Sequence, residues 1–263
     1  MAIITLTTDF GSSDHYTGVV KGVILGIDPQ AIIVDLTHQV ARHEISSAAF
    51  LLLAAHRYFP SGTIHLVVVD PGVGSQRRLL AARSGGSFYV APDNGVISYL
   101  LDLGQHWELR WLDNLDYRLP RVGDTFHGRD ILAPAAAYLS KGLPLEQLGG
   151  PAAASDLVRL PPLAPDISGD SIIGRVVYID HFGNLTTNIP LADLWSGPFA
   201  DITIEIGPIK LDGLVRAYAE VEPGAMMAIG GSSGFLEIAR NMGRADTITG
   251  LSINATVWVK RKS

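Results

Sequence analysis

The first half of the chain alternates short apolar runs, rich in β-branched residues, with longer segments of helical spacing. These runs and segments follow one another at residues 3–8, 15–27, 31–36, 44–59 and 63–69. Strands that helices cover on both faces read as continuous apolar runs. The order strand, helix, strand, helix, strand therefore predicts an α/β domain with a mainly parallel sheet and right-handed crossovers.

A hairpin and two more helices are predicted to complete this half of the chain. Two strand-like runs at 79–83 and 88–91 flank Ser84-Gly-Gly86, which is a typical turn sequence. Residues 94–103 and 130–140 have the spacing of helices. No internal repeat interrupts the pattern.

The pattern changes in the second half. Residues 149–170 are rich in Pro, Ala and Gly without periodicity, so they are predicted to form a linker. Beyond them, strand-like runs follow closely without long helices, at residues 172–179, 202–206, 226–229, 235–239 and 251–259. This spacing is typical of a small β domain. We predict an α/β domain over residues 1–160 and a β domain over residues 161–263.

Composition narrows the class of protein. Of the 263 residues, 47% are hydrophobic and 17% are charged, against about 25% charged in an average soluble protein. A net charge of -6, with no basic cluster beyond Lys260-Arg-Lys262, argues against a nucleic-acid partner. The absence of cysteine excludes disulfides and thiolate chemistry.

The chain is expected to be a soluble cytoplasmic protein without a membrane partner. Its longest apolar run, residues 48–55, is much shorter than the ~20 residues that span a bilayer. The N-terminal segment lacks a basic region and reaches Asp9 after a short strand-like run, so it does not resemble a signal peptide.

Polar side chains gather where the first-half strands are predicted to end. They are Asp9 and Asp14 after the first strand, Asp35, Thr37 and His38 at the second, and Asp70 and Arg77 after the third. Any one such aspartate is often only a turn or cap residue. Ligands of open α/β sheets bind beyond the carboxyl ends of the strands, so several polar groups at one edge favour a ligand site.

Several common sites are not supported. Gly72-Val-Gly74 lacks the dinucleotide fingerprint and the Walker lysine, no G-x-S-x-G elbow is present, and no H-x-x-x-H pair occurs, so no metal is expected. His127 stands before Gly128 at a predicted helix start, where a single histidine is often structural. The turns at 180–184 and 230–237 are either ordinary hairpin turns or hold a small ligand.

Seven segments taken together resemble the S-adenosyl-L-methionine (SAM) hydroxide adenosyltransferase family, which is related to SAM-dependent fluorinating and chlorinating enzymes. They are TTDFG (7–11), DLTHQV (35–40), VVDPGVGSQRR (68–78), APDNG (91–95), TFHGRD (125–130), IDHFGNLTTN (179–188) and GSSGFLEIARNMG (231–243). They occur in order and extend from the first strand almost to the C-terminus.

The resemblance implies an N-terminal catalytic α/β domain and a C-terminal β-barrel-like domain. It also implies a homotrimer, with the substrate between the N-terminal domain of one subunit and the C-terminal domain of its neighbour. The implied activity is hydrolysis of SAM by water or hydroxide at the ribose C5′, which releases adenosine and L-methionine. SAM is then the substrate, and no cofactor is expected.

The site residues are carried over by motif. The Asp-Arg-His set of the water-using members falls on Asp70, Arg77 and His127. The resemblance assigns substrate binding to Asp9 (ribose hydroxyls), Asn184 and the backbone near Met242 (adenine), Tyr218 (stacking), and Asp14, Asp180, Ser232 and Glu237 (methionine end or adenosine edge).

Departures from the halogenating relatives favour water over halide. Those relatives have Tyr and Thr in the turn that contains Asp70, Ser in place of Gly128, and, in the fluorinating enzymes, a long insertion after that turn. Here the run from residue 78 to residue 91 is short. An Arg that touches the substrate in the halogenases is replaced here by Ser233. The resemblance therefore leaves open how the substrate carboxylate is bound.

The reaction needs a positioned nucleophile more than an acid, because neutral methionine leaves readily from a sulfonium. Holding water in line with C5′ can lower the activation barrier by roughly 7–11 kcal/mol. A general base can increase the rate by about 10²–10⁴-fold. The sequence leaves open whether Asp70 or His127 takes the proton. Rival hypotheses are a non-catalytic adenosine or SAM sensor, a SAM-dependent halogenase, and a scaffold in which an Asp70–Arg77 pair only stabilises a turn.

Overall fold

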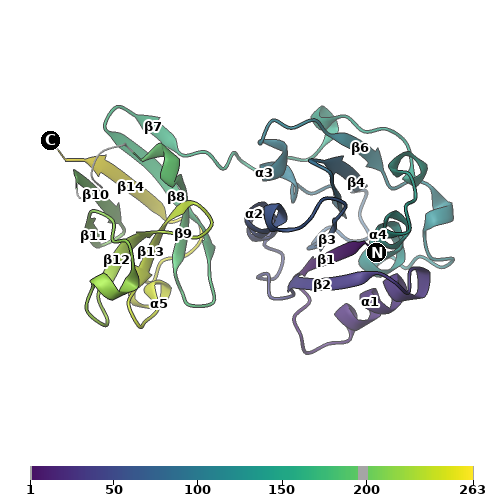
Figure 1. Cartoon of the computed structure of the whole chain (residues 1–263), viewed down its shortest axis with the longest axis horizontal. Helices are drawn as coiled ribbons and strands as arrows, with labels where there is room; N and C mark the ends of the chain where they lie inside the picture. Colours follow the sequence, from purple (N-terminus) through teal and green to yellow (C-terminus); the bar gives the residue numbers. More distant parts are fainter. Residues whose placement is uncertain (1, 195–200, 263) are drawn as a thin grey trace. The chain divides into compact units, whose positions relative to one another are not determined.

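The computed structural model describes residues 2–194 and 201–262, which form two compact units, Met1–Pro161 and Pro162–Ser263. The first unit is an α/β domain and the second is built mainly from antiparallel strands, so the predicted fold class is confirmed (Figure 1). No helix within the described residues combines the length and the apolar character that crossing a bilayer requires.

The sheet of the first unit has the strand order β2-β1-β3-β5-β4-β6. Its strands are β1 (Ile3–Thr8), β2 (Ile32–Thr37), β3 (Ile64–Val68), β4 (Leu79–Ser84), β5 (Ser87–Pro92) and β6 (Glu108–Trp111). Strands β2, β1, β3 and β5 run parallel, whereas β4 pairs antiparallel with β5 and β6. The carboxyl ends of β1, β2 and β3 therefore lie at one edge, as the sequence predicts.

Helices cover both faces of this sheet. They are α1 (Tyr16–Ile27), α2 (Ile45–Ala55), α3 (Ser98–Leu101) and α4 (Ala133–Ser140), with a π-helical turn at Gly128–Leu132 that leads into α4. Helices α1 and α4 pack against each other on one face, and α2 and α3 lie on the other (Figure 1). Every residue of β3 is buried, because this strand lies inside the sheet and under helices.

Short 3-10 turns complete the two units. They are His56–Tyr58, Leu115–Tyr117, Leu145–Leu148, Ala154–Asp156, Leu191–Asp193 and Tyr218–Glu220.

Two predicted helices are shorter than expected. The helix predicted over residues 44–59 ends at Ala55, and that predicted over 94–103 is reduced to Ser98–Leu101. Asn94 accounts for the second difference: its side chain accepts from the Val96 N–H (3.2 Å) and donates to the carbonyl of Val69 (2.8 Å), which holds a turn in place of a helix start. Strand β6 was missed, since its place is decided by pairing with β4.

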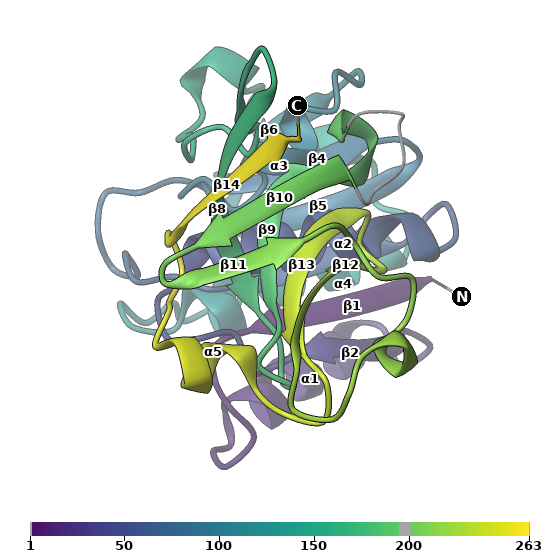
Figure 2. The same cartoon turned by 90° about the vertical axis from the view of Figure 1, so that its left-hand side faces the viewer.

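The second unit is a curved antiparallel sheet with the order β11-β10-β14-β8-β9-β13-β12, and β7 pairs with β8 (Figure 2). Its strands are β7 (Asp166–Ser168), β8 (Ser171–Ile179), β9 (Leu185–Pro190), β10 (Ile202–Ile206), β11 (Ile209–Asp212), β12 (Met226–Gly230), β13 (Phe235–Arg240) and β14 (Thr256–Arg261). The terminal strands β11 and β12 contact each other, so the sheet is nearly closed and barrel-like.

Strand β9 was not predicted, because its sequence LTTNIP is polar although most of it is buried. The hydroxyl of Thr187 donates to the Leu236 carbonyl (2.9 Å) and the Asn188 amide donates to the Leu163 carbonyl (2.8 Å). These bonds satisfy the buried polar groups. Strand β11 and the short helix α5 (Ala245–Thr249) were also missed.

The predicted linker over residues 149–170 contains short structured segments. Pro151 forms an isolated antiparallel β-bridge with Arg110 of β6. The N–H of Val158 donates to Asp93 Oδ1 (3.0 Å) in the first unit. Residues Asp166–Ser168 form β7 in the second unit. The boundary between the two units falls inside the predicted linker, at Pro161 and Pro162, so the linker prediction holds there, whereas its two ends form short elements of the adjoining units.

Candidate functional site

A cluster of Asp70, Arg77 and His127 lies at the carboxyl end of β3. Arg77 donates from Nε to Asp70 Oδ1 (2.6 Å) and from Nη2 to Asp70 Oδ2, and the same Nη2 is 2.9 Å from His127 Nδ1. The Asp70 and Arg77 side chains are only 6% and 10% exposed. The three residues that the resemblance assigns to catalysis are thus in direct contact.

Two glycines allow the segments carrying this cluster to approach each other. Gly74 has φ +79°, and a Cβ there would lie 2.5 Å from the Asp124 carbonyl oxygen. A Cβ on Gly128 would lie 2.7 Å from Val68 Cγ1 at the end of β3. Any larger residue would push the turn after β3 away from the segment that carries His127.

Hydrogen bonding decides the tautomer of His127. A guanidinium only donates and stays charged, so Nδ1 of the histidine must accept from Arg77. The neutral ring then carries its proton on Nε2. Burial, and after it the charge of Arg77, lower the pKa of His127 below its ordinary value of 6.5, so the neutral form is favoured.

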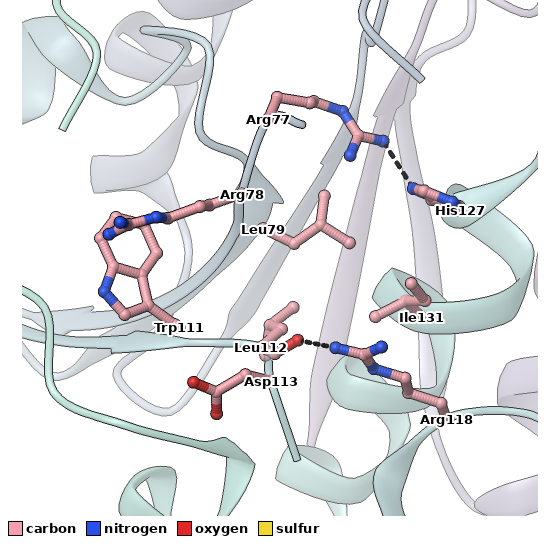
Figure 3. Close-up of a pocket in the computed structure, with 9 residues that line it drawn as sticks. All are labelled: Arg77, Arg78, Leu79, Trp111, Leu112, Asp113, Arg118, His127 and Ile131. Carbon is pink, nitrogen blue, oxygen red and sulfur yellow. Dashed lines mark hydrogen bonds between the residues drawn. The ribbon is translucent and has the colours of Figure 1, made fainter. Parts of the chain in front are cut away.

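A cavity of about 610 Å³ adjoins Arg77 and His127 (Figure 3). It is lined by Arg77, Arg78, Leu79, Trp111, Leu112, Asp113, Arg118, His127 and Ile131. The Arg78 guanidinium lies over the Trp111 ring, 4.5 Å from its centroid, and Arg118 donates to the Leu112 carbonyl (Figure 3).

Asp9 and Asp14 lie in the neighbouring turn after β1. Asp9 Oδ2 accepts from the His43 N–H (3.1 Å), and Asp14 is exposed. Neither side chain forms an ion pair among the described residues. Both carboxylates therefore keep capacity for a ligand.

The role of His38 in shaping this turn was not foreseen. Its Nδ1 is 2.9 Å from Thr8 Oγ1, its carbonyl accepts from the Gly11 N–H (2.7 Å), and its Nε2 lies 3.1 Å from Asp35 Oδ1. Asp35 in turn accepts from Lys21 Nζ (2.6 Å). The strand-end position of His38 pointed to this edge, but only the structure shows that it secures the turn carrying Asp9.

A second cluster joins three predicted substrate-binding residues of the second unit. Asn184 donates from its backbone N–H to Asp180 Oδ1 (2.8 Å) and from Nδ2 to Asp180 Oδ2 (2.9 Å). The same amide nitrogen is 3.1 Å from the Tyr218 hydroxyl. These bonds present the Asn184 side chain in one orientation.

A cavity of about 570 Å³ lies beside this cluster, lined by His181, Phe182, Asn184, Tyr218, Arg240, Met242, Gly243 and Arg244. Phe182 is 71% exposed and Met242 is 86% exposed. Met242 also has φ +51°, an uncommon conformation for a residue with a side chain. Exposed apolar side chains around a few polar groups are typical of a site for a flat ligand.

Ser232 and Ser233 lie in the turn from β12 to β13, and Glu237 follows in β13. Glu237 Oε1 is 3.4 Å from the Thr186 hydroxyl, and burial, with the charge of Asp180 second, raises the pKa of its carboxyl. Ser232 is exposed and makes no hydrogen bond through its side chain within the described ranges. Ser233 Oγ is buried and has no partner there.

The residues described contain no group of three or more His, Cys, Asp or Glu side chains placed to hold a metal ion.

Comparison with known proteins identifies the family. The models of the SAM hydroxide adenosyltransferase N-terminal and C-terminal domains match residues 4–149 and 174–258. An (R)-S-adenosyl-L-methionine hydrolase of Thermus thermophilus is 38% identical, over 95% of this chain and 96% of the relative. A fluorinase of Nocardia brasiliensis is 29% identical over 98% and 96% of the two chains.

A solved structure has the same fold. An uncharacterized conserved protein from Thermotoga maritima superposes with a TM-score of 0.90 at 36% identity, covering 99% of this chain and 100% of the other. The matched models, the hydrolase relative and this structure agree over nearly the whole length. The chain belongs to the SAM hydroxide adenosyltransferase family.

Proposed function

We propose that the protein hydrolyses SAM at the ribose C5′ to adenosine and L-methionine. The observation that carries the proposal is the contact of Asp70, Arg77 and His127 at the carboxyl end of β3. Family membership and the activity named for the Thermus relative support it. Because that name specifies the (R) sulfonium epimer, this epimer is the first substrate to test.

In the proposed step, a water oxygen attacks C5′ as the C5′–S bond breaks. The bonding electrons pass to sulfur, which leaves as neutral methionine, and the water loses one proton. The sulfonium is already an activated leaving group, so the reaction needs neither an acid nor a cofactor. The protein must hold the water in line with the C5′–S bond and accept the proton.

Asp70 is the proposed proton acceptor. His127 Nδ1 already accepts from Arg77 and Nε2 carries the ring proton, so the neutral histidine has no free lone pair for a water proton. Each Asp70 oxygen accepts one bond from Arg77 and retains a further lone pair. His127 then orients the water by donation from Nε2, and Arg77 orients both partners.

The substrate itself is proposed to use the acidic side chains and the second-unit cluster. SAM is a sulfonium cation with an ammonium group, which suits Asp14, Asp180 and Glu237. Asp9 would bind the ribose hydroxyls and Ser232 the methionine end. Adenine would contact Asn184, Tyr218 and Met242, beside the cavity of the second unit.

A product assay tests the proposal. Purified protein is incubated with each SAM epimer, with and without chloride, and adenosine, methionine and 5′-chloro-adenosine are followed by chromatography. We expect adenosine and methionine at equal rates with and without chloride, and loss of both in Asp70→Ala. A chloride-dependent halogenated product would replace the hydrolase with a halogenase, and binding without turnover would replace it with a sensor.

We also propose that the protein is a homotrimer whose sites combine groups of neighbouring subunits, as the resemblance implies. Co-assembly of inactive Asp70→Ala with binding-impaired Asn184→Ala, assayed at SAM far below the native KM, where both variants alone turn over little, tests this. If sites are shared, some contain both native residues and activity returns on mixing after dissociation and reassembly. No return of activity, with mixed assemblies verified by mass, would place each site within one chain. The cytoplasmic location stays a prediction, to be tested by cell fractionation.

A further inference from the structure

The cavity beside Arg77 and His127 holds more positive charge than the proposed hydrolysis uses. Three guanidinium groups line it, those of Arg77, Arg78 and Arg118. Arg77 is paired with Asp70. In the described part of the chain, neither Arg78 nor Arg118 forms an ion pair with a carboxylate.

Arg118 shows most clearly a guanidinium whose hydrogen-bond donors are not all paired. Its Nη2 donates to the Leu112 carbonyl, but its Nε is buried and has no hydrogen-bond partner among the described residues. A buried donor without a partner costs free energy, and a buried charge costs more. The position of this guanidinium at the cavity wall makes an anion the partner that would satisfy it (Figure 3).

The remaining lining groups do not neutralise this charge. Asp113 is the carboxylate of the lining, and its Oδ1 accepts from the Gly150 N–H (3.0 Å). The Arg78 guanidinium lies over the Trp111 ring and forms no side-chain hydrogen bond among the described residues, so its N–H groups can donate to a ligand. The other walls include the apolar side chains of Leu79, Leu112 and Ile131.

We propose that this cavity is a binding site for a small oxyanion, held by Arg78 and Arg118 next to the Arg77–His127 pair. Guanidinium groups match the geometry of phosphate and carboxylate oxygens through paired N–H donors. Two sources share this chemistry: a free inorganic oxyanion, and the carboxylate of methionine, the proposed product.

Direct binding measurements test the site without SAM, so their outcome does not depend on the hydrolase proposal. Calorimetric titrations with inorganic phosphate and with L-methionine, at low ionic strength, compare the full chain with Arg118→Gln. Arg121→Gln is the matched control, because Arg121 lies on the same segment, is exposed and does not line the cavity. Thermal melting verifies that each variant is folded.

We expect at least one of the two ligands to bind the native chain, with affinity at least about 10-fold lower in Arg118→Gln and unchanged in Arg121→Gln. The ligand that shows this dependence identifies the source. Arg78→Gln, at an exposed position, should weaken the same ligand if Arg118→Gln fails to fold. Absence of binding to the native chain, or equal binding by the native chain and both cavity variants, would overturn the proposal.

Discussion

The two clusters of polar side chains differ in how their charges are arranged. In the first unit, Asp70 and Arg77 form a nearly buried ion pair that also contacts His127. In the second unit, Asp180 is held by the amide and backbone N–H of Asn184, without a cation in hydrogen-bond contact among the described residues. One cluster is internally neutralised and its ion pair is nearly buried, and the other is acidic and lies beside a cavity with exposed apolar side chains.

This difference indicates a division of labour. A buried carboxylate held by a guanidinium is preorganised to orient and deprotonate a small polar molecule, because its geometry is set before the ligand arrives. An acidic cluster next to exposed Phe182 and Met242 suits a cation with a flat apolar part. The comparison predicts that changes in the first cluster affect kcat, whereas changes in the second affect KM.

The largest effect is expected for Asp70→Asn. The amide keeps the shape but cannot accept a proton, so kcat for SAM hydrolysis should fall about 10²–10⁴-fold with KM changed little. Steady-state kinetics with adenosine detection measures both constants. Asp116→Asn, at an exposed position in a 3-10 turn, is the control and should behave as the native chain. A KM effect without a kcat effect would break the proposed division.

Acid should destabilise the first unit through His65. Burial, then the charge of His56, lowers the pKa of His65 from 6.5 to about 4, and its Nδ1 is 2.9 Å from Thr5 Oγ1. The unfolded chain therefore binds the proton more readily, and stability falls as pH drops from about 6.5 toward 4, by about 3 kcal/mol. Urea unfolding of the native chain and His65→Gln should show this pH dependence only in the native chain.

In the second unit, Glu237 contributes to the pH dependence of folding stability with the opposite sign. The raised pKa of Glu237 means that the folded state binds the proton more readily, so this contribution to stability is present at low pH and is lost as pH rises through the folded pKa. Glu237→Gln should remove it. Equal pH dependence of the native chain and both variants would contradict the two assignments.

Gly128→Ala tests whether close packing holds the first cluster together. The new Cβ would meet Val68 Cγ1 at 2.7 Å, so the His127 segment or β3 must shift, at a cost of about 1–3 kcal/mol. Denaturant unfolding should show this loss together with a lower kcat. Gly142→Ala has φ +87° but open space around its Cβ, so it should lower stability through backbone strain while kcat is retained.

The smallest effect is expected for Asn184→Ala, which should change KM, whereas Asp70→Asn should change kcat. Loss of the amide removes the bonds to Asp180 and Tyr218 and the proposed adenine contact, so KM should rise about 10-fold with kcat changed little. Initial rates measured over a range of SAM concentrations up to saturation give kcat and KM separately. A fall in kcat comparable to that of Asp70→Asn would show that the two clusters do not divide binding from chemistry.

Local sequence patterns anticipated the elements whose stability is local. Strands β1 and β10 have the predicted bounds, and β3, β8 and the β4–β5 hairpin differ from prediction by a residue or two. Their apolar runs bury themselves wherever they pair. Strands β6 and β9 were missed because one depends on pairing with β4 and the other buries polar residues that distant carbonyls satisfy.

By itself the sequence determined the fold class and the candidate residues, since buried strands require apolar runs and the motifs retain their spacing. Tertiary structure decided which candidates touch: Asp70 meets His127 through Arg77 because Gly74 and Gly128 permit two distant segments to pack at short range. It also decided the tautomer of His127, the support of the Asp9 turn by His38 and the unpaired charge of Arg118. Hydrogen-bond direction and burial depend on neighbours far apart in sequence, which no local pattern records.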